Sequence, residues 1–301
     1  MRVIILGSAA GGGVPQWNCG CEQCRDARAR DARRTQSSVA VSADGERWIL
    51  LNASPDVGAQ LAARRVLWPR DARGTPVRAV ALTDAEIDHT LGLALLREGT
   101  APLPVYAPSG VAALLDDEWP LVRLLRAYAG VEPRLLPDGQ VVALADLAGT
   151  PLGISCTAVA VAHRPPRYAP AARSASFAVG LRLADERSGR ALAYIPTAGA
   201  VDDAVRRLAA GSELLLFDGT FWSDGELRSA GVDAPTAREM GHLPVGGPGG
   251  SAALLPQLGA KRTVLVHINN TNPILRRGGP ERAEVEAAGL TVGEDGMEFE
   301  L

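Results

Sequence analysis

Short apolar runs recur along the whole chain, and turn residues separate one run from the next. Many of them are rich in small and β-branched apolar residues, which predicts buried strands. Asp44-Gly45, between two such runs, is a hairpin signal. The predicted strands cover residues 2–6, 38–42, 48–52, 77–82, 104–106, 141–144, 156–161, 176–183, 191–195, 213–217, 262–266 and 297–299.

Helical stretches lie between these strands. Ser54-Pro55-Asp56 offers a capping hydroxyl, a proline for the first turn and an acid, which predicts a helix start. Further helices are predicted over residues 91–99, 109–115, 118–129, 201–208, 250–258 and 280–288. Because no repeat, low-complexity tract or linker interrupts the alternation, we predict one α/β domain over residues 1–301.

The composition is that of a globular protein, with 47% hydrophobic and 22% charged residues in 301. The net charge is −3 and no basic patch is present, so we expect no nucleic-acid partner. No apolar run is long enough to span a membrane, and the run before Gly7 is too short for a signal peptide. The expected location is therefore the cytoplasm, where thiols stay reduced. The oligomeric state stays open.

The turn between the predicted strand 77–82 and the next helix concentrates metal-binding chemistry. Asp84, Glu86, Asp88 and His89 supply three carboxylates and one imidazole within six residues. A strand-to-helix turn can direct several side chains at one point, and this set suits a divalent metal. The alternative is a helix N-terminus that favours acids, but that alternative does not explain the histidine.

A second group of ligands lies near the N-terminus. Cys19, Cys21 and Cys24 form a C-x-C-x-x-C cluster within a loop of about residues 15–30. In a reduced compartment this spacing predicts structural zinc rather than a disulfide. A tetrahedral site needs a fourth ligand, and Cys156, a histidine or an amide oxygen are the candidates. A redox pair is the alternative.

The glycine-rich segment Gly7–Gly13 follows the first predicted strand. Its backbone amides could hold a phosphate, but the P-loop ending is missing and no clear helix follows. We therefore expect a close approach of this backbone to a neighbouring site.

Further polar residues stand at strand ends, where ligands bind in α/β sheets. His163 follows one predicted strand, and Asp218 ends another. His242 lies in a glycine-rich loop before a helix, and His267 opens the polar segment 267–273. With His89, these are the chain's four histidines.

This arrangement resembles the metallo-β-lactamase superfamily, whose turn motif is T-H-x-H-x-D-H-x-x-G. The residues that match the motif are Thr83, Asp88, His89 and Gly92. Asp84 and Glu86 stand where that family usually has two histidines. The resemblance also implies that His163 and His267 are later metal ligands. His242 resembles the mobile general-acid histidine of the tRNA-processing and phosphodiesterase branches.

Longer motifs resemble the PqqB family, the B proteins of coenzyme PQQ (pyrroloquinoline quinone) synthesis. They are the cysteine cluster and the segments 52–56, 83–89, 240–244 and 267–273. The resemblance covers essentially the full length and implies a four-layer αβ/βα sandwich of two mixed sheets, a structural zinc and a role in PQQ biosynthesis. In related phosphodiesterases a histidine three residues after the last ligand completes the cysteine site, and Asn270 stands there in this chain.

If Asp88, His89 and His267 converge, they form the two-histidine, one-carboxylate set of non-haem Fe(II) oxygenases. We therefore expect an active-site divalent metal, Fe²⁺ in preference to Zn²⁺, although both accept these ligands. Asp84 and Glu86 are either further ligands or acids that fix an imidazole, and we include them among the catalytic candidates.

The resemblance implies hydroxylation of the tyrosine ring in a small-molecule PQQ precursor, the cross-linked Glu–Tyr unit. His242 and Asp218 are the candidates for proton transfer or substrate orientation. Arg164 and Arg167 could hold substrate carboxylates, or could be solvated surface residues. Other PQQ-pathway proteins are possible partners.

Two other functions stay open. One is a soluble carrier that takes part in transport of PQQ or its precursor toward the periplasm. The other is a metal-dependent hydrolase, such as a peptidase that releases the cross-linked unit. The scarcity of histidine disfavours the hydrolase, because a two-zinc site draws heavily on imidazole.

Overall fold

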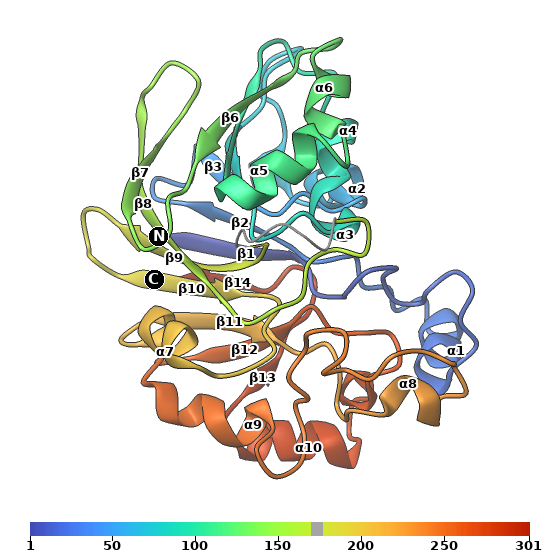
Figure 1. Cartoon of the computed structure of the whole chain (residues 1–301). Coiled ribbons are helices and arrows are strands. Elements are labelled where there is room, and N and C mark those ends of the chain that lie inside the picture. The colour runs from blue at the N-terminus through green and yellow to red at the C-terminus, as the bar shows by residue number, and fades with distance from the viewer. Residues whose placement is uncertain (170–176) are drawn as a thin grey trace.

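The computed structural model describes residues 1–169 and 177–301. Two sheets face each other and helices cover their outer faces, which gives four layers in the order helix, sheet, sheet, helix (Figure 1). Within these described residues each sheet contains seven strands, with parallel and antiparallel neighbours. The predicted αβ/βα sandwich of two mixed sheets is confirmed.

The first sheet combines the N-terminal strands with the last one. Its order is β14 (Glu298–Glu300), β1 (Arg2–Gly7), β2 (Ser38–Ser42), β3 (Trp48–Leu51), β4 (Val77–Ala81), β5 (Leu103–Ala107) and β6 (Val131–Leu135). The order of the second is β13 (Thr291–Val292), β12 (Thr263–Val266), β11 (Leu214–Asp218), β10 (Ala191–Ile195), β9 (Val179–Asp185), β8 (Pro151–Ala160) and β7 (Val141–Ala145).

The helices fall into three groups (Figure 1). Those against the first sheet are α2 (Val57–Ala62), α3 (Ile87–Thr90), α4 (Gly92–Leu95), α5 (Ser109–Asp116) and α6 (Leu121–Leu125). Those against the second sheet are α7 (Asp203–Ala209), α9 (Ser251–Leu254) and α10 (Pro280–Ala287). The remaining two, α1 (Glu22–Ala29) and α8 (Glu226–Ser229), lie together in a part that projects to one side.

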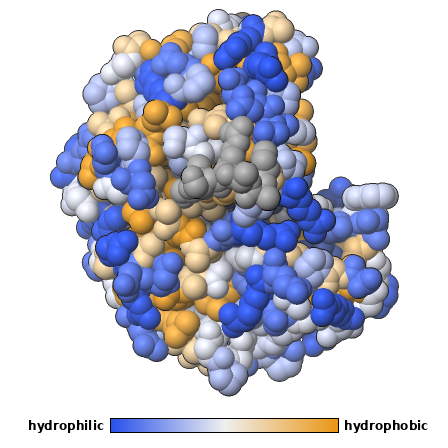
Figure 2. All heavy atoms as spheres, in the orientation of Figure 1, coloured by the Kyte–Doolittle hydropathy of each residue, from blue (hydrophilic) through white to orange (hydrophobic). Residues whose placement is uncertain are grey.

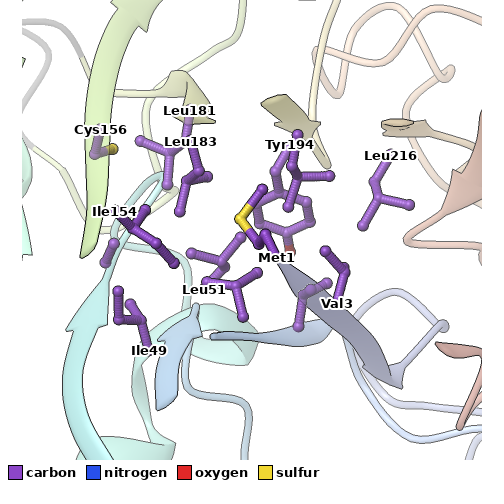
Figure 3. Packing of buried hydrophobic residues seen from close by; sticks show 14 of the residues in the cluster. Met1, Val3, Ile49, Leu51, Ile154, Cys156, Leu181, Leu183, Tyr194 and Leu216 are labelled. Atoms are coloured by element: carbon purple, nitrogen blue, oxygen red, sulfur yellow. The ribbon is translucent and has the colours of Figure 1, made fainter. Parts of the chain in front are cut away.

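Apolar side chains from both sheets fill the space between them (Figure 3). Val3 and Ile5 of β1 face this inter-sheet core, while Ile4 and Leu6 face the helices on the other side. Both faces of the strand are therefore buried, which explains why its sequence is continuously apolar. Labelled members from other strands are Ile49, Leu51, Ile154, Cys156, Leu181, Leu183, Tyr194 and Leu216.

Several elements differ from the predictions for a local reason. Strand β6 was not predicted, because Glu132, Pro133 and Arg134 disfavour a central strand; it lies at the edge of its sheet. Pro120 delays the helix predicted over 118–129, which becomes the short α6. The predicted start of one strand, Ser176, lies outside the described residues.

The surface in Figure 2 is largely hydrophilic, with smaller hydrophobic areas between the polar residues. None of the helices in the described part of the chain combines the length and the apolar character needed to span a bilayer.

Candidate metal centres

All four histidines of the chain come together, three of them after strands of the two sheets and His242 in the loop between α8 and α9. His89 lies in α3, just beyond the end of β4, and His267 follows β12 directly. Their imidazole rings lie next to one another. The ring centroids of His89 and His267 are 5.0 Å apart, those of His267 and His242 are 5.7 Å apart, and those of His242 and His163 are 5.3 Å apart. The fold therefore collects residues 89, 163, 242 and 267 in one place.

Asp84 fixes the ring of His89. The Nδ1 atom of His89 lies 2.8 Å from each oxygen of the Asp84 carboxylate. Thr83 Oγ1 and the backbone N–H of Glu86 also donate to Asp84, at 2.9 and 3.0 Å. Burial alone would lower the pKa of His89, but the charges of Asp84 and Asp88 outweigh it and raise the pKa to about 9. The Nε2 atom of His89 is buried and has no hydrogen-bond partner among the residues that the structure describes.

Thr220 and Asp218 support His267. The Nδ1 atom of His267 lies 2.8 Å from Thr220 Oγ1, which donates to Asp218 Oδ1 at 2.6 Å. The backbone of His267 has a φ of 56°, in the left-handed region that residues other than glycine seldom adopt. His267, at the end of β12, is thus held by a hydrogen bond at its ring and has an unusual backbone conformation.

His242 and His163 are held in the same way. His242 Nδ1 lies 2.7 Å from Asp218 Oδ2, and His163 Nδ1 lies 2.9 Å from the carbonyl oxygen of Gly241. Burial, followed by the neighbouring His242, lowers the pKa of His163.

All four imidazoles therefore use Nδ1 for a bond within the protein. When Nδ1 carries the proton of a neutral imidazole, Nε2 has a lone pair. This is the arrangement in which partner groups orient histidine ligands toward a metal. In that tautomer, the four Nε2 atoms are the nitrogen atoms that a metal could bind.

Asp88, His89 and His267 form a compact group. Each offers one ligand atom, and the three atoms lie within 4.8 Å of one another. Asp88 Oδ2 is 3.4 Å from Nε2 of His267 and 3.8 Å from Nε2 of His89. Two atoms held tetrahedrally at about 2.1 Å from one ion lie about 3.4 Å apart, so these distances fit a single divalent ion. The unpartnered Nε2 of buried His89 fits the same ion.

A second group, Asp218 with His242 and His267, also lies within 4.8 Å, but its carboxylate is fully engaged. Asp218 Oδ2 accepts from the backbone N–H of Ala198 and from His242, and Oδ1 accepts from the backbone and side chain of Thr220. Burial opposes ionisation of Asp218, yet His242 and these bonds lower its pKa. The group is therefore a hydrogen-bonded relay rather than a set of free ligands.

Glu86 and the predicted arginines lie at the margin of the centre. Glu86 belongs to none of the ligand groups found among the described residues, and burial together with Asp84 and Asp88 raises its pKa to about 7. Arg164, beside His163, donates to the carbonyl of Glu239 at 3.1 Å. Arg167 is exposed. Neither Asp84 nor Glu86 joins Asp88 in the compact group, and His163 also lies outside it.

The glycine-rich segment packs against Asp88, as a close backbone approach predicts. A Cβ atom at Gly11 would lie 3.2 Å from Asp88 Oδ2. Asp88 itself is ionised readily: burial opposes this, but His89 and His267 outweigh burial and lower its pKa. Glycine at position 11 therefore leaves room for the carboxylate of the compact group.

The cysteine loop forms a separate centre at the start of α1. The sulfur atoms of Cys19, Cys21 and Cys24 lie within 4.8 Å of one another. Asn270 packs against them: its side-chain Nδ2 is 3.3 Å from Cys24 Sγ, and its backbone carbonyl oxygen is 3.4 Å from Cys21 Sγ. Cys156 lies in the inter-sheet core instead, where burial raises its pKa to about 12.

Two supporting features were not predicted. Thr220 lies two residues after Asp218, the end of a predicted strand, but its contact with His267 was not predicted. Asn52 was placed only in a family motif, yet it accepts from the backbone N–H of Thr83 and so supports the residue that binds Asp84. A sequence shows such groups, but it does not show which partner each one faces.

Comparison with known proteins identifies the class first. A family model described as the β-lactamase superfamily domain matches residues 47–268. A crystal structure of a diphosphatase from the PhnP family, 23% identical, covers 100% of this chain and 97% of that one with a TM-score of 0.69, and shows the shared fold. The chain belongs to the β-lactamase superfamily, with the metallo-β-lactamase fold.

Full-length relatives narrow the class. Coenzyme PQQ synthesis protein B of Cupriavidus necator is 44% identical over 306 residues, 99% of both chains, and that of Methylococcus capsulatus is 43% identical over 307 residues, 100% of both. The crystal structure of Zn²⁺-bound PqqB from Methylobacterium extorquens is 41% identical, with a TM-score of 0.91 and 100% coverage of both chains. The chain is a member of the PqqB family.

Proposed function

We propose that the chain acts in the biosynthesis of coenzyme PQQ as a metal-dependent hydroxylase. Its substrate is the aromatic ring of the cross-linked Glu–Tyr precursor, a small molecule. The observation that carries the proposal is the compact group of Asp88, His89 and His267, in which the buried Nε2 of His89 has no partner. Two histidines and one carboxylate leave coordination positions open for O₂ and substrate.

The two centres have different roles in this proposal. Cys19, Cys21 and Cys24 hold a structural zinc, with Asn270 as the fourth ligand. Asp88, His89 and His267 hold the active-site metal, Fe²⁺. When bound, ferrous iron supplies the redox chemistry that activates O₂. Three neighbouring thiols without a disulfide suit a reducing compartment, the cytoplasm.

The surrounding residues position the reactants. Asp84 orients His89 through Nδ1. Asp218 holds His242 through Nδ1, so that Nε2 of His242 is the atom that exchanges a proton with the substrate. Arg164, near His163 at the margin of the centre, is the candidate for a substrate carboxylate.

A two-metal hydrolase is disfavoured because hydrogen bonds already occupy the carboxylates of Asp84 and Asp218. Asp84 uses both oxygens on His89 and its own turn, and Asp218 uses both on His242, Thr220 and the backbone of Ala198. Few ligands are then left for a second ion near His163.

The test uses the whole chain, loaded with Fe²⁺ without oxygen and mixed with the cross-linked Glu–Tyr substrate. Insertion of one oxygen atom into a ring C–H bond leaves the other atom of O₂ to become water, so ascorbate is added as a two-electron reductant. We expect O₂ uptake and a product heavier by one oxygen atom with the absorbance of a catechol, all lost in His89→Ala. Tight binding of PQQ without turnover would favour the carrier, and cleavage of the precursor peptide with two zinc ions bound would favour the hydrolase.

A further inference from the structure

The hydroxyl of Thr220 lies between a buried carboxylate and a candidate metal ligand. Thr220 is 3% exposed, Asp218 is fully buried and His267 is 5% exposed. The Oγ1 atom of Thr220 is 2.6 Å from Asp218 Oδ1 and 2.8 Å from His267 Nδ1. Thr220 is therefore a direct link from Asp218 to His267.

The direction of the two hydrogen bonds follows from the acceptors. Both oxygens of Asp218 accept backbone N–H groups, from Thr220 at Oδ1 and from Ala198 at Oδ2, as a carboxylate does. The single hydroxyl proton of Thr220 therefore points to Asp218. Thr220 Oγ1 is then an acceptor toward His267, and His267 Nδ1 must carry a proton.

The opposite tautomer of His267 has an alternative partner. Its Nε2 atom lies 3.4 Å from Asp88 Oδ2, close enough for a small rotation to form an Nε2–H bond to that carboxylate. Such a bond would occupy two members of the compact group at once, His267 and Asp88. The shorter contact, at 2.8 Å to Thr220, draws the proton to Nδ1 instead.

We propose that Thr220 is a positioning residue that keeps the proton of His267 on Nδ1 and so prevents a blocking hydrogen bond between His267 and Asp88. The effect on metal affinity rests on the proposed function, in which both residues are ligands. The effect on the tautomer does not, because it follows from the contacts of Thr220 alone. Asp218 also holds His242, so a change at Thr220 isolates the His267 branch of the relay.

Thr220→Val is the decisive variant, because valine keeps the shape and removes only the hydroxyl. The backbone contacts of Thr220 remain: its N–H donates to Asp218, and its carbonyl accepts from the backbone N–H of Asn269 and the side chain of Asn272. Thr220→Ser restores the hydroxyl and is the matched control. A folding defect would show in both the thermal midpoint and the amide spectrum.

The first measurement is ¹⁵N NMR of histidine-labelled protein that carries zinc at the cysteine loop and no ion at Asp88, at alkaline pH. Only four imidazoles contribute signals, and histidine-to-glutamine variants assign them. We expect an Nδ1–H tautomer for His267 in the native chain and in Thr220→Ser, and an Nε2–H tautomer in Thr220→Val. An Nε2–H tautomer in the native chain, or no change in Thr220→Val, overturns the inference.

The second measurement is the affinity for Co²⁺ at the same centre, followed by its visible absorption. We expect Thr220→Val to bind Co²⁺ about 10- to 100-fold more weakly, as for other partners that orient a ligand, and Thr220→Ser to stay within about threefold. If the tautomer changes and the affinity does not, the inference about Thr220 stands and the assignment of His267 as a ligand in the proposed function fails.

Discussion

The cysteine loop and the Asp88 centre are assembled in opposite ways. The three cysteines lie within six residues, and the fold adds one residue from far away, Asn270. The three residues of the Asp88 centre span positions 88–267, and buried partners hold their rings. Soft thiolates in a closed cluster suit a structural ion, whereas imidazoles with a carboxylate suit an ion with open positions. The first centre depends on local spacing and the second on the packing of two sheets.

The comparison predicts the largest loss of stability at the cysteine loop. Cys24→Ala removes a thiolate from a fully buried position, so we expect loss of zinc and a fall of the thermal midpoint by about 10 °C or more, because structural zinc contributes folding free energy. Cys156→Ala is the control for the loss of a buried thiol. We expect its zinc content to stay unchanged and its free energy of unfolding to fall by about 1 kcal/mol, which lowers the thermal midpoint by a few degrees. Metal analysis measures the zinc content and calorimetry the thermal midpoint. Equal zinc loss in both variants would contradict the assignment of the zinc site to the cysteine loop.

The Asp88 centre should lose its metal with the fold intact. For His89→Ala we expect the affinity for Fe²⁺ or Co²⁺ to fall by more than about a hundredfold, because loss of a ligand exceeds loss of a supporting partner. His163→Ala is the control: it lies outside the compact group, and its affinity should stay within about threefold. Equilibrium dialysis with the cysteine zinc retained measures both. Similar losses would make His163 a ligand.

The pH dependence should separate the two centres further. The pKa of His89 rises from 6.5 in the unfolded chain to about 9 in the folded one. Burial opposes this rise, but the negative charges of Asp84 and Asp88 outweigh burial. Its protonation therefore stabilises the metal-free fold fully below pH 6.5, and this contribution disappears as the pH rises through 9. The difference is on the order of 3 kcal/mol. Urea unfolding of Asp84→Asn should show a clearly smaller decline; an identical decline would contradict the assignment.

Asn270 tests how closed the cysteine centre is. Asn270→Ala should weaken zinc binding by about tenfold, because the side-chain amide beside Cys24 and Cys21 is removed while three thiolates remain. Asn270→His supplies a common zinc ligand at the same position and should retain or tighten binding. Competition with a chromophoric chelator measures both. Unchanged affinity in the alanine variant would point to another fourth ligand.

The smallest predicted effect concerns the glycine beside Asp88. Gly11→Ala places a methyl group 3.2 Å from Asp88 Oδ2, so the carboxylate must shift and Co²⁺ affinity should fall about threefold. Gly20→Ala, in the cysteine loop, meets nothing within 4 Å and should change neither centre. A larger loss of Co²⁺ affinity in Gly20→Ala than in Gly11→Ala would show that the close approach at Gly11 is unimportant.

Sequence patterns predicted most of the strands, because most strands are buried on both faces and their apolar runs are visible without a structure. The sandwich itself was predicted from the resemblance to a known family. They failed at β6, where Pro133 and two charged neighbours conceal an edge strand. The cysteine cluster was predictable because its ligands are neighbours in the chain.

The details of the Asp88 centre were predictable only in part. The sequence indicated acids around His89, and it left open whether Asp84 binds a metal or an imidazole. The structure places Asp84 on Nδ1 of His89, a choice that depends on backbone geometry at the turn. Thr220 was beyond prediction because its partner His267 lies 47 residues away.

At His267 the left-handed backbone favours glycine for stability, whereas the proposed function requires an imidazole at the same position. Glycine would relax the chain there, since strain of this kind costs on the order of 1 kcal/mol or more, but glycine brings no nitrogen. Laboratory evolution that selects for thermal stability alone should therefore replace the histidine at position 267. Retention of that imidazole across diverging descendants would mark the lineages that still handle an ion, and its loss would mark those that only fold.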